Sequence, residues 1–127
     1  MAFTIDHLDH LVLTVADLDA TIDFYSKTMG MEPVSFDGRR ALKFGGQKIN
    51  LHLAGHEFEP KAGRATPGSA DVCFITKDPL EEVMRHLATV GVKIEKGPVD
   101  KTGAVGKLLS VYFRDPDGNL IEVSNYV

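Results

Sequence analysis

The strongest constraint on this chain is an internal repeat, in which a strand, a capped helix and three further strands occur twice. A shift of 61 residues superposes His10 on Asp71, Asp17 on Asp78 and Gly30 on Gly91. Near the C-terminus the shift grows to 72 residues and superposes Gly46 on Gly118 and Asn50 on Glu122. Because the halves share caps, stops and strand order, the sequence predicts two copies of one supersecondary module.

The first half shows this pattern from local signals alone. Residues 8–15 alternate and are rich in β-branched side chains, which is typical of a strand. Asp17 then stands at an N-cap position, apolar residues recur at helical spacing, and Gly30 stands where a helix ends. Asp-Gly and Gly-Gly dipeptides separate three further predicted strands, at 33–37, 40–45 and 47–53.

The second half restarts the pattern after a connector, residues 55–69, which holds two prolines and three glycines without periodicity. A strand is predicted over 70–76, followed by a helix with Asp78 as its N-cap, Pro79 at its first position and Gly91 at its end. The last strands are predicted near 92–96, 108–114 and 119–125. The glycine-rich insertion at 97–107 is a candidate lid.

These elements predict an α+β fold of two βαβββ modules, at 8–54 and 70–125, within a single domain spanning residues 1–127. A chain of this length buries enough apolar surface to fold without disulfides. Its single cysteine, Cys73, excludes an intramolecular disulfide, so a reducing compartment is expected.

The net charge and the hydropathy of the chain limit the kinds of partner and the compartment that we expect. A net charge of −4 argues against nucleic acid as the main partner, because phosphate binding needs a surplus of Lys and Arg. The N-terminal segment lacks the positive region of a signal peptide, and no apolar run approaches the length of a membrane span. We therefore expect a cytoplasmic protein with a small-molecule partner.

Strand alternation places one set of polar side chains on the face of the sheet that is turned away from the helices. The set consists of His10, Asn50, His52, Asp71 and Glu122. Burying uncompensated carboxylates costs several kcal/mol, so these side chains need pairing, solvent or a cation. Imidazole and carboxylate ligands suit Zn, Ni, Fe or Mn, and a divalent metal site is the simplest expectation.

Three residues on this face have two possible roles each, and further residues near it could contact a substrate. His52 is a metal ligand or a hydrogen-bonding partner of Asn50 or of a substrate, and Asp71 is a ligand or a turn acceptor. Cys73 also points into the cavity, where a small hydrophobe is commoner than a nucleophile. Three side chains would form an apolar wall: Val12, Ile75 and Leu120. Four loop cations could meet an anionic substrate: Lys61, Arg64, Lys101 and Lys107.

The opening DHLVLTVADLDATIDFY and the closing YFRDPDGNLIEV resemble the vicinal oxygen chelate superfamily, which includes glyoxalase I, fosfomycin-resistance thiol transferases, extradiol dioxygenases and bleomycin-resistance proteins. The middle, ALKFGGQKINLHLAGHEFEPKAG with PGSADVCFIT, is similar to small glyoxalase-domain-containing proteins of the type numbered five, some of them virulence-associated in bacteria. The resemblance covers almost the whole chain. It implies that the two modules form a half-barrel with a concave site.

The resemblance also implies a ligand set on the first and last strand of each module. His10 and Glu122 match the family pattern. Asp71 stands where a second His is usual, and Asn50 stands where glyoxalase I has a Glu, with His52 two residues on. The superfamily further implies a homodimer in which His10 of one copy would meet Glu122 of the other.

The leading hypothesis is a metal-dependent lyase or isomerase of the glyoxalase I type, acting on a bidentate oxygen substrate such as a glutathione thiohemiacetal. Glu122 would move the proton, and Asn50, Cys73 and Tyr112 would contact the substrate. The alternatives are an Fe(II) extradiol-type dioxygenase using His10, His52 and Glu122, a thiol transferase, and a non-catalytic ligand-sequestering protein of the bleomycin-resistance type.

Overall fold

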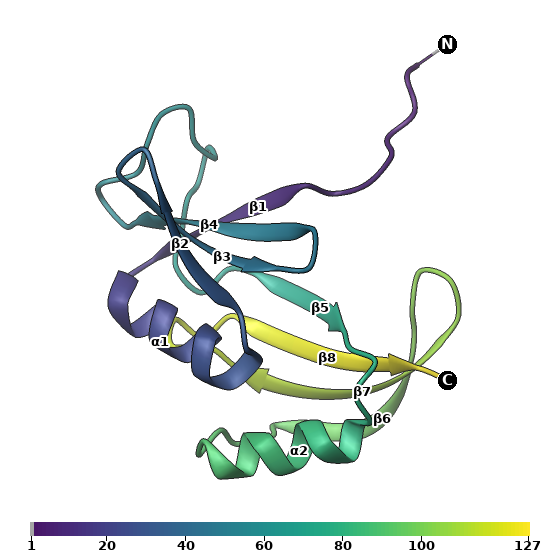
Figure 1. Cartoon of the computed structure of the whole chain (residues 1–127). Coiled ribbons are helices and arrows are strands. Elements are labelled where there is room, and N and C mark those ends of the chain that lie inside the picture. Colours follow the sequence, from purple (N-terminus) through teal and green to yellow (C-terminus); the bar gives the residue numbers. More distant parts are fainter. Residues whose placement is uncertain (1) are drawn as a thin grey trace.

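The computed structural model describes residues 2–127 and shows the first predicted module as one mixed four-stranded sheet with one helix (Figure 1). The strand order is β1-β4-β3-β2, with β1 parallel to β4 and the other pairs antiparallel. The elements are β1 (His10–Val15), α1 (Leu18–Met29), β2 (Glu32–Phe36), β3 (Arg39–Phe44) and β4 (Gln47–Leu53).

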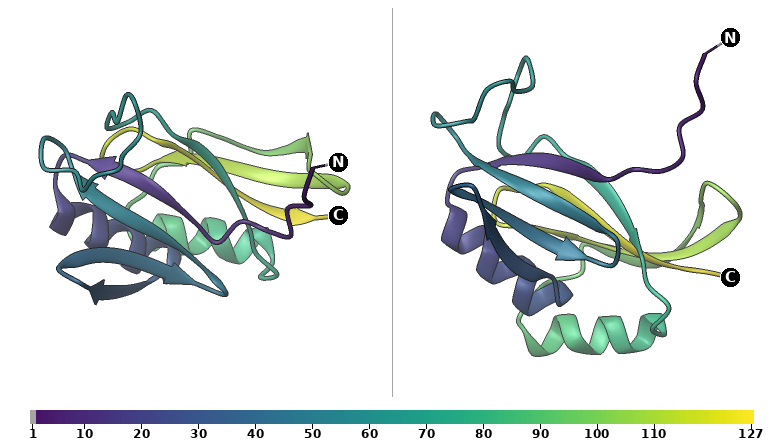
Figure 2. Two further views of the ribbon diagram at one scale, coloured as in Figure 1. Left: turned by 90° about the horizontal axis from the view of Figure 1, so that it is seen from above. Right: turned by 45° about the horizontal axis from the view of Figure 1, so that its top comes forward.

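The second module repeats this topology, with the strand order β5-β8-β7-β6 and β5 parallel to β8. Its elements are β5 (Asp71–Ile75), α2 (Leu80–Thr89), β6 (Lys96–Thr102), β7 (Lys107–Arg114) and β8 (Leu120–Tyr126). Both sheets are open. Because the two modules have the same strand order and one helix each, the prediction of an α+β fold built from two βαβββ modules is confirmed. In Figure 2 the two helices lie on the side of the molecule opposite the connector, residues 55–69.

Helix α1 forms as its local sequence predicts. The Asp17 side chain accepts a hydrogen bond from the Ala20 N–H at 3.0 Å, which satisfies one of the free donors of the first turn. Gly30 ends the helix with φ at 67°, a left-handed conformation that glycine adopts without a Cβ clash, and its N–H donates to the Ser26 carbonyl.

Helix α2 begins differently from the prediction, because Asp78 is not its cap. The cap position is occupied by Pro79, whose side chain makes no capping bond. The Leu80 N–H instead donates to Oδ1 of Asn125, on β8, at 2.9 Å. Nδ2 of Asn125 donates to the Thr76 and Asp78 carbonyls, so one amide fixes the whole β5–α2 joint. A side chain from a distant strand therefore replaces the predicted local cap.

The predicted strand near 92–96 and the predicted lid at 97–107 are both wrong. Strand β6 occupies Lys96–Thr102 and pairs with β7, with an irregularity between Lys96 and Val99. Gly97 lies in this irregularity at φ 116°, and a Cβ there would collide with the Ser110 carbonyl. The glycine thus allows close approach of two strands, and the loop shortens to 103–106.

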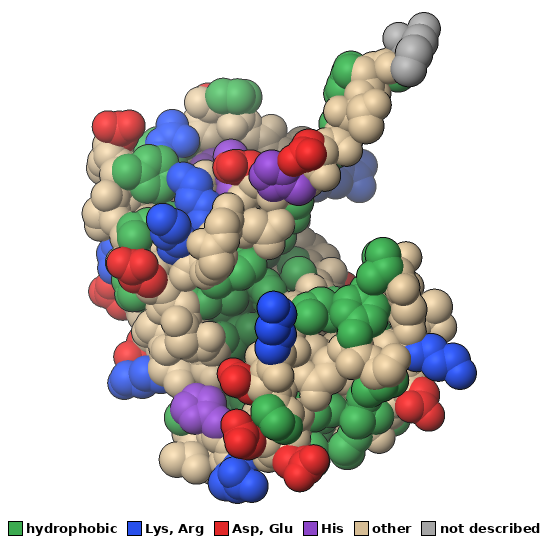
Figure 3. Space-filling view, turned by 45° about the vertical axis from the view of Figure 1, so that its right-hand side comes forward, with side chains coloured by type: hydrophobic (Ala, Val, Ile, Leu, Met, Phe, Trp, Pro, Cys, Tyr) green, Lys and Arg blue, Asp and Glu red, His purple; other side chains and the backbone are tan. Residues whose placement is uncertain are grey.

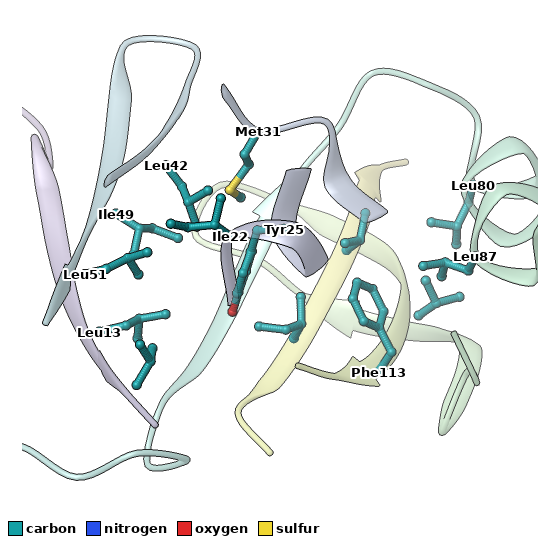
Figure 4. Close-up of a cluster of buried hydrophobic side chains, with 14 residues drawn as sticks. Leu13, Ile22, Tyr25, Met31, Leu42, Ile49, Leu51, Leu80, Leu87 and Phe113 are labelled. Carbon is teal, nitrogen blue, oxygen red and sulfur yellow. The ribbon is translucent and has the colours of Figure 1, made fainter. Parts of the chain in front are cut away.

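One hydrophobic core runs through both modules (Figure 4). Figure 4 shows α1 between strands of the two sheets, with Ile22 and the fully buried Tyr25 projecting from the helix. The Phe24 ring of α1 lies 6.3 Å from the ring of Phe113 on β7, so a first-module helix packs on a second-module strand. Shared burial of this kind fixes the orientation of one sheet relative to the other.

The turn between β7 and β8, residues 115–119, also joins the modules through hydrogen bonds. The Tyr25 hydroxyl donates to the buried Asp115 carboxylate at 2.6 Å, and the Ala16 N–H donates to Asp117 at 3.1 Å. Asn119 donates to Asp115 and accepts from the Ala70 N–H. Burial and then the Asp115 bond and charge raise the pKa of Tyr25, so this hydroxyl stays protonated as a donor. No helix within residues 2–127 is both long enough and apolar enough to cross a membrane.

Candidate metal and substrate site

Glu122 is the best-supported polar group on the exposed face of the second sheet. It lies on the inner strand β8, in register with Cys73 on one side and Tyr112 on the other. The hydroxyls of Ser110 and Ser124 donate to its Oε2 at 2.6 and 3.3 Å. Both serines are fully buried, so they hold the carboxylate in one orientation while Oε1 stays available for another partner.

The two neighbours of Glu122 are held in their neutral forms. Burial, and then the charge of Glu122, raises the pKa of Tyr112 to about 12, so its hydroxyl is a donor at neutral pH. The Cys73 sulfur lies 3.4 Å from the Ser124 hydroxyl oxygen. Partial burial is the main cause that raises the pKa of this thiol, and the charges of Glu122 and Asp71 add to it. A raised pKa disfavours a nucleophilic role for Cys73.

Asp71 begins β5 on the same face as Glu122, two register positions away from Cys73, the residue that pairs with Glu122. Its side chain is exposed, and no hydrogen bond to its carboxylate is found among residues 2–127. The alternative role of a turn acceptor therefore has no observed donor in the described chain.

His10 carries a supporting carboxylate of its own. Its Nδ1 lies 2.8 Å from Oδ2 of Asp9, and 42% of its side chain is exposed. The bond to His10 is the main cause that holds the pKa of Asp9 below its usual value, so the carboxylate accepts and Nδ1 donates. In the neutral ring, this bond leaves the lone pair of Nε2 for a ligand. Metal-binding histidines in proteins commonly have such a carboxylate partner.

The other two first-module residues lie on β4 and have different surroundings. Oδ1 of Asn50 is buried without a hydrogen-bond partner in the described chain. His52 is only 6% exposed, and its ring meets the Phe58 ring of the connector edge-on, with centroids 5.6 Å apart. It lines a cavity of about 550 Å³ between the connector and strands β1 and β4.

The structure brings some of the predicted site residues together and leaves others apart. Cys73, Tyr112 and Glu122 form one cluster in the second module, whereas His10 and His52 lie in the first. Within residues 2–127, no group of three or more His, Cys, Asp or Glu side chains is placed to hold one metal ion. Val12 and Ile75 of the predicted apolar wall are 45% and 50% exposed. The described part of one chain therefore shows no complete metal site, and Val12 and Ile75 stay open to solvent.

A larger cleft, of about 770 Å³, lies between the modules, at the C-terminal end of α1 and beside β5 and α2. Figure 3 shows hydrophobic side chains gathered in the hollow between the two parts of the molecule. The cleft wall includes Met29, Phe44 and Phe74, and it reaches the candidate site at Cys73 and at Ile75 of the predicted apolar wall.

Sequence reasoning missed the residues that support the predicted ligands. Ser110 on β7 and Ser124 on β8 are paired with each other and lie on the same face as Glu122. The two-residue period of a strand would have been enough to predict this placement. Asp9 directly precedes His10, but only coordinates show that its carboxylate reaches Nδ1.

Residues 7–123 match the family model of the Glyoxalase/Bleomycin resistance protein/Dioxygenase superfamily. The chain belongs to this superfamily. It is 56% identical to virulence protein STM3117 of Salmonella typhimurium over 124 residues, which are 97% of this chain and 86% of that one. The crystal structure of STM3117 matches with a TM-score of 0.97 over 98% of this chain and all of that one. The resemblance inferred from the sequence is confirmed.

Further relatives include enzymes. Glyoxalase domain-containing protein RDO1 of Mycosarcoma maydis is 56% identical over 94% of this chain and 68% of its own length. Metallothiol transferase FosB of Shouchella clausii is 27% identical over 94% of this chain and 80% of its own length. The structure of lactoylglutathione lyase from Agrobacterium tumefaciens is 25% identical, covers 96% of this chain and 95% of its own, and has a TM-score of 0.75.

Proposed function

We propose that this superfamily member is a metal-dependent enzyme of the glyoxalase I type, acting on a small substrate with two neighbouring oxygens such as a glutathione thiohemiacetal. His10 and Glu122 would be its main metal ligands. The observation behind the proposal is that each of them has a supporting partner and a free coordinating atom, through Asp9 in one case and Ser110 in the other. The likeness to a lactoylglutathione lyase supports the reaction type.

The donor chemistry of these residues fits a first-row divalent ion such as Ni, Zn, Mn or Fe, because imidazole and carboxylate are its usual ligands. Residues 2–127 of one chain hold no cluster of three candidate ligands. We therefore propose a homodimer in which the His10 face of one copy covers the Glu122 face of the other. Asp71, on the Glu122 face, is the proposed third ligand. Pairing of the two faces would also cover the exposed Val12 and Ile75 side chains.

A divalent ion held there would supply Lewis-acid polarisation of two neighbouring substrate oxygens. Glu122 would accept the proton from the substrate carbon and return it to the adjacent carbon. Ser110 and Ser124 fix the carboxylate during this transfer, and the neutral Tyr112 hydroxyl can donate to a substrate oxygen. Val12 and Ile75 would exclude water once the faces meet, which strengthens each polar contact.

The test compares metal content in protein purified without chelators. Wild-type protein should hold a stoichiometric divalent ion and isomerise a glutathione thiohemiacetal, whereas the double variant His10→Ala/Glu122→Ala should lose both properties. The matched control, His56→Ala/Glu81→Ala, removes one exposed imidazole and one exposed carboxylate elsewhere and should keep both. A double variant that retains the full metal content would contradict the proposal.

The second candidate is a thiol transferase that uses the same residues. FosB, a metallothiol transferase by name, favours it. Consumption of a free thiol with an electrophilic co-substrate, and no turnover of a thiohemiacetal, would support this candidate over the first. Ring cleavage by an Fe(II) site of His10, His52 and Glu122 is less well supported, because the connector and its Phe58 ring cover His52.

A further inference from the structure

We propose that the cavity beneath the connector binds an oxyanion of the substrate, a carboxylate or a phosphoryl group, with His52 and Arg64 as its direct contacts. This connector cavity has a volume of about 550 Å³, within the range of small-molecule sites. Its walls come from the ends of β1 and β4, from the connector and from the start of the second module. The inference deepens the proposed function, on which its account of the whole substrate rests.

The charge of the cavity wall selects an anion. Among the described residues that line it, Lys61, Arg64 and His52 are the groups able to hold positive charge, and no Asp or Glu lines it. Lys61 is engaged, because its Nζ lies 3.1 Å from a Glu57 oxygen and 3.8 Å from a Glu59 oxygen. Arg64 has no ion pair within residues 2–127, so its guanidinium is free to bind two oxygens of one anion.

His52 is a buried polar ring that lacks a protein partner. More than nine-tenths of the residue is buried, and its imidazole makes no hydrogen bond within the described chain. Phe58 packs edge-on against this ring, and the Arg39 guanidinium in turn lies 4.4 Å from the Phe58 ring centroid. Buried polar groups are normally hydrogen-bonded, so an unpaired ring that lines a cavity indicates a ligand atom as its partner. A neutral imidazole N–H suffices as the donor.

The position of the cavity determines how far the anionic group of a substrate lies from its chelating oxygens. His52 is in register with Thr14, four residues along β1 from His10. Four strand residues span about 13 Å. A substrate whose chelating oxygens lie at His10 would therefore reach the connector cavity with an anionic group roughly 13 Å away. Small dicarbonyls without an anionic extension would leave the cavity unfilled.

The test uses protein stripped of metal with EDTA and then dialysed free of the chelator, so that it depends neither on the metal site nor on a competing carboxylate. The ring-proton NMR signals of His52 are followed while glutarate or inorganic phosphate replaces chloride at constant ionic strength. We expect a saturable shift at His52 and none at the exposed His56. Arg64→Gln should weaken this binding at least tenfold, and Lys77→Gln, which removes the same charge from another exposed loop, should leave it unchanged.

The outcomes separate the two ligand sources and the two proposals. Saturation by glutarate alone assigns a carboxylate, and saturation by phosphate alone assigns a phosphoryl group. No saturable shift with either anion, or equal binding by wild-type protein and Arg64→Gln, would overturn the inference. His52→Leu should keep the full metal content, and loss of metal would show that His52 is a metal ligand instead. Anion binding in a protein whose metal survives His10→Ala/Glu122→Ala would uphold this inference and refute the proposed function.

Discussion

At the scale of single residues, close neighbours orient the two main candidate ligands and keep Tyr112 neutral. The ionised Asp9 orients the His10 ring, and the buried Ser110 hydroxyl orients Glu122. Tyr112 stays neutral beside that carboxylate. The orientation of both ligands and the neutral form of Tyr112 are therefore set before a metal or a substrate binds, which is the preorganisation that catalysis needs.

Glu122→Gln should lower the pKa of Tyr112. Burial is the larger cause of the rise to about 12, and the Glu122 charge is the next, so the pKa should fall toward its ordinary value of 10.0 without reaching it. Ultraviolet titration of tyrosinate in Glu122→Gln, with the exposed Glu32→Gln as control, measures the change. An unchanged titration curve would show that the two side chains do not interact.

Glu57 should make stability depend on pH in the acid range. The Gly55 N–H bond, and then Lys61, hold its pKa below the ordinary value of 4.5. A depressed carboxyl pKa contributes stability above the unfolded pKa, and this contribution is lost as pH falls through the folded pKa. Urea unfolding between about pH 6 and pH 3 should show a smaller loss of stability in Glu57→Gln than in wild-type protein. Equal losses would show that the Gly55 and Lys61 contacts of Glu57 do not contribute to stability.

At the scale of elements, the sequence predicted what local signals determine and missed what distant strands determine. Helix α1 has its own Asp17 cap and Gly30 stop, and both are confirmed. The cap of α2 comes from Asn125, which lies 45 residues away in the chain, and no local pattern marks it. Gly97 and Pro98 suggested a loop, but they lie in the strand β6, because the adjacent β7 backbone determines the pairing there.

Asn125→Ala should destabilise the protein by about 1–2 kcal/mol, because it removes the donor and acceptor that fix the β5–α2 joint. Asp78→Ala should change the free energy of unfolding by less than about 0.5 kcal/mol, since its side chain caps nothing. Chemical denaturation of both variants measures the difference. The reverse order of effects would mean that Asp78 is the cap after all.

At the scale of the whole molecule, a duplicated module explains both the fold and the incomplete site. The shared core and the turn at 115–119 hold the two sheets in one orientation. Glu122 lies on β8, close to the end of that turn. The sequence predicted which face each candidate ligand occupies, since strand period determines it. It could not show whether one chain gathers three ligands, because that depends on how the modules pack, and within residues 2–127 no such group is found.

The most direct test of the account is a heterodimer of one His10→Ala chain and one Glu122→Ala chain, co-expressed with different affinity tags and purified through both. If each site takes His10 from one copy and Glu122 from the other, this heterodimer keeps one intact site of two. Its metal content by elemental analysis should then be about half that of the wild-type dimer, while each parent homodimer should hold almost none. A heterodimer as metal-free as its parents, or parents that keep their metal, would contradict the account.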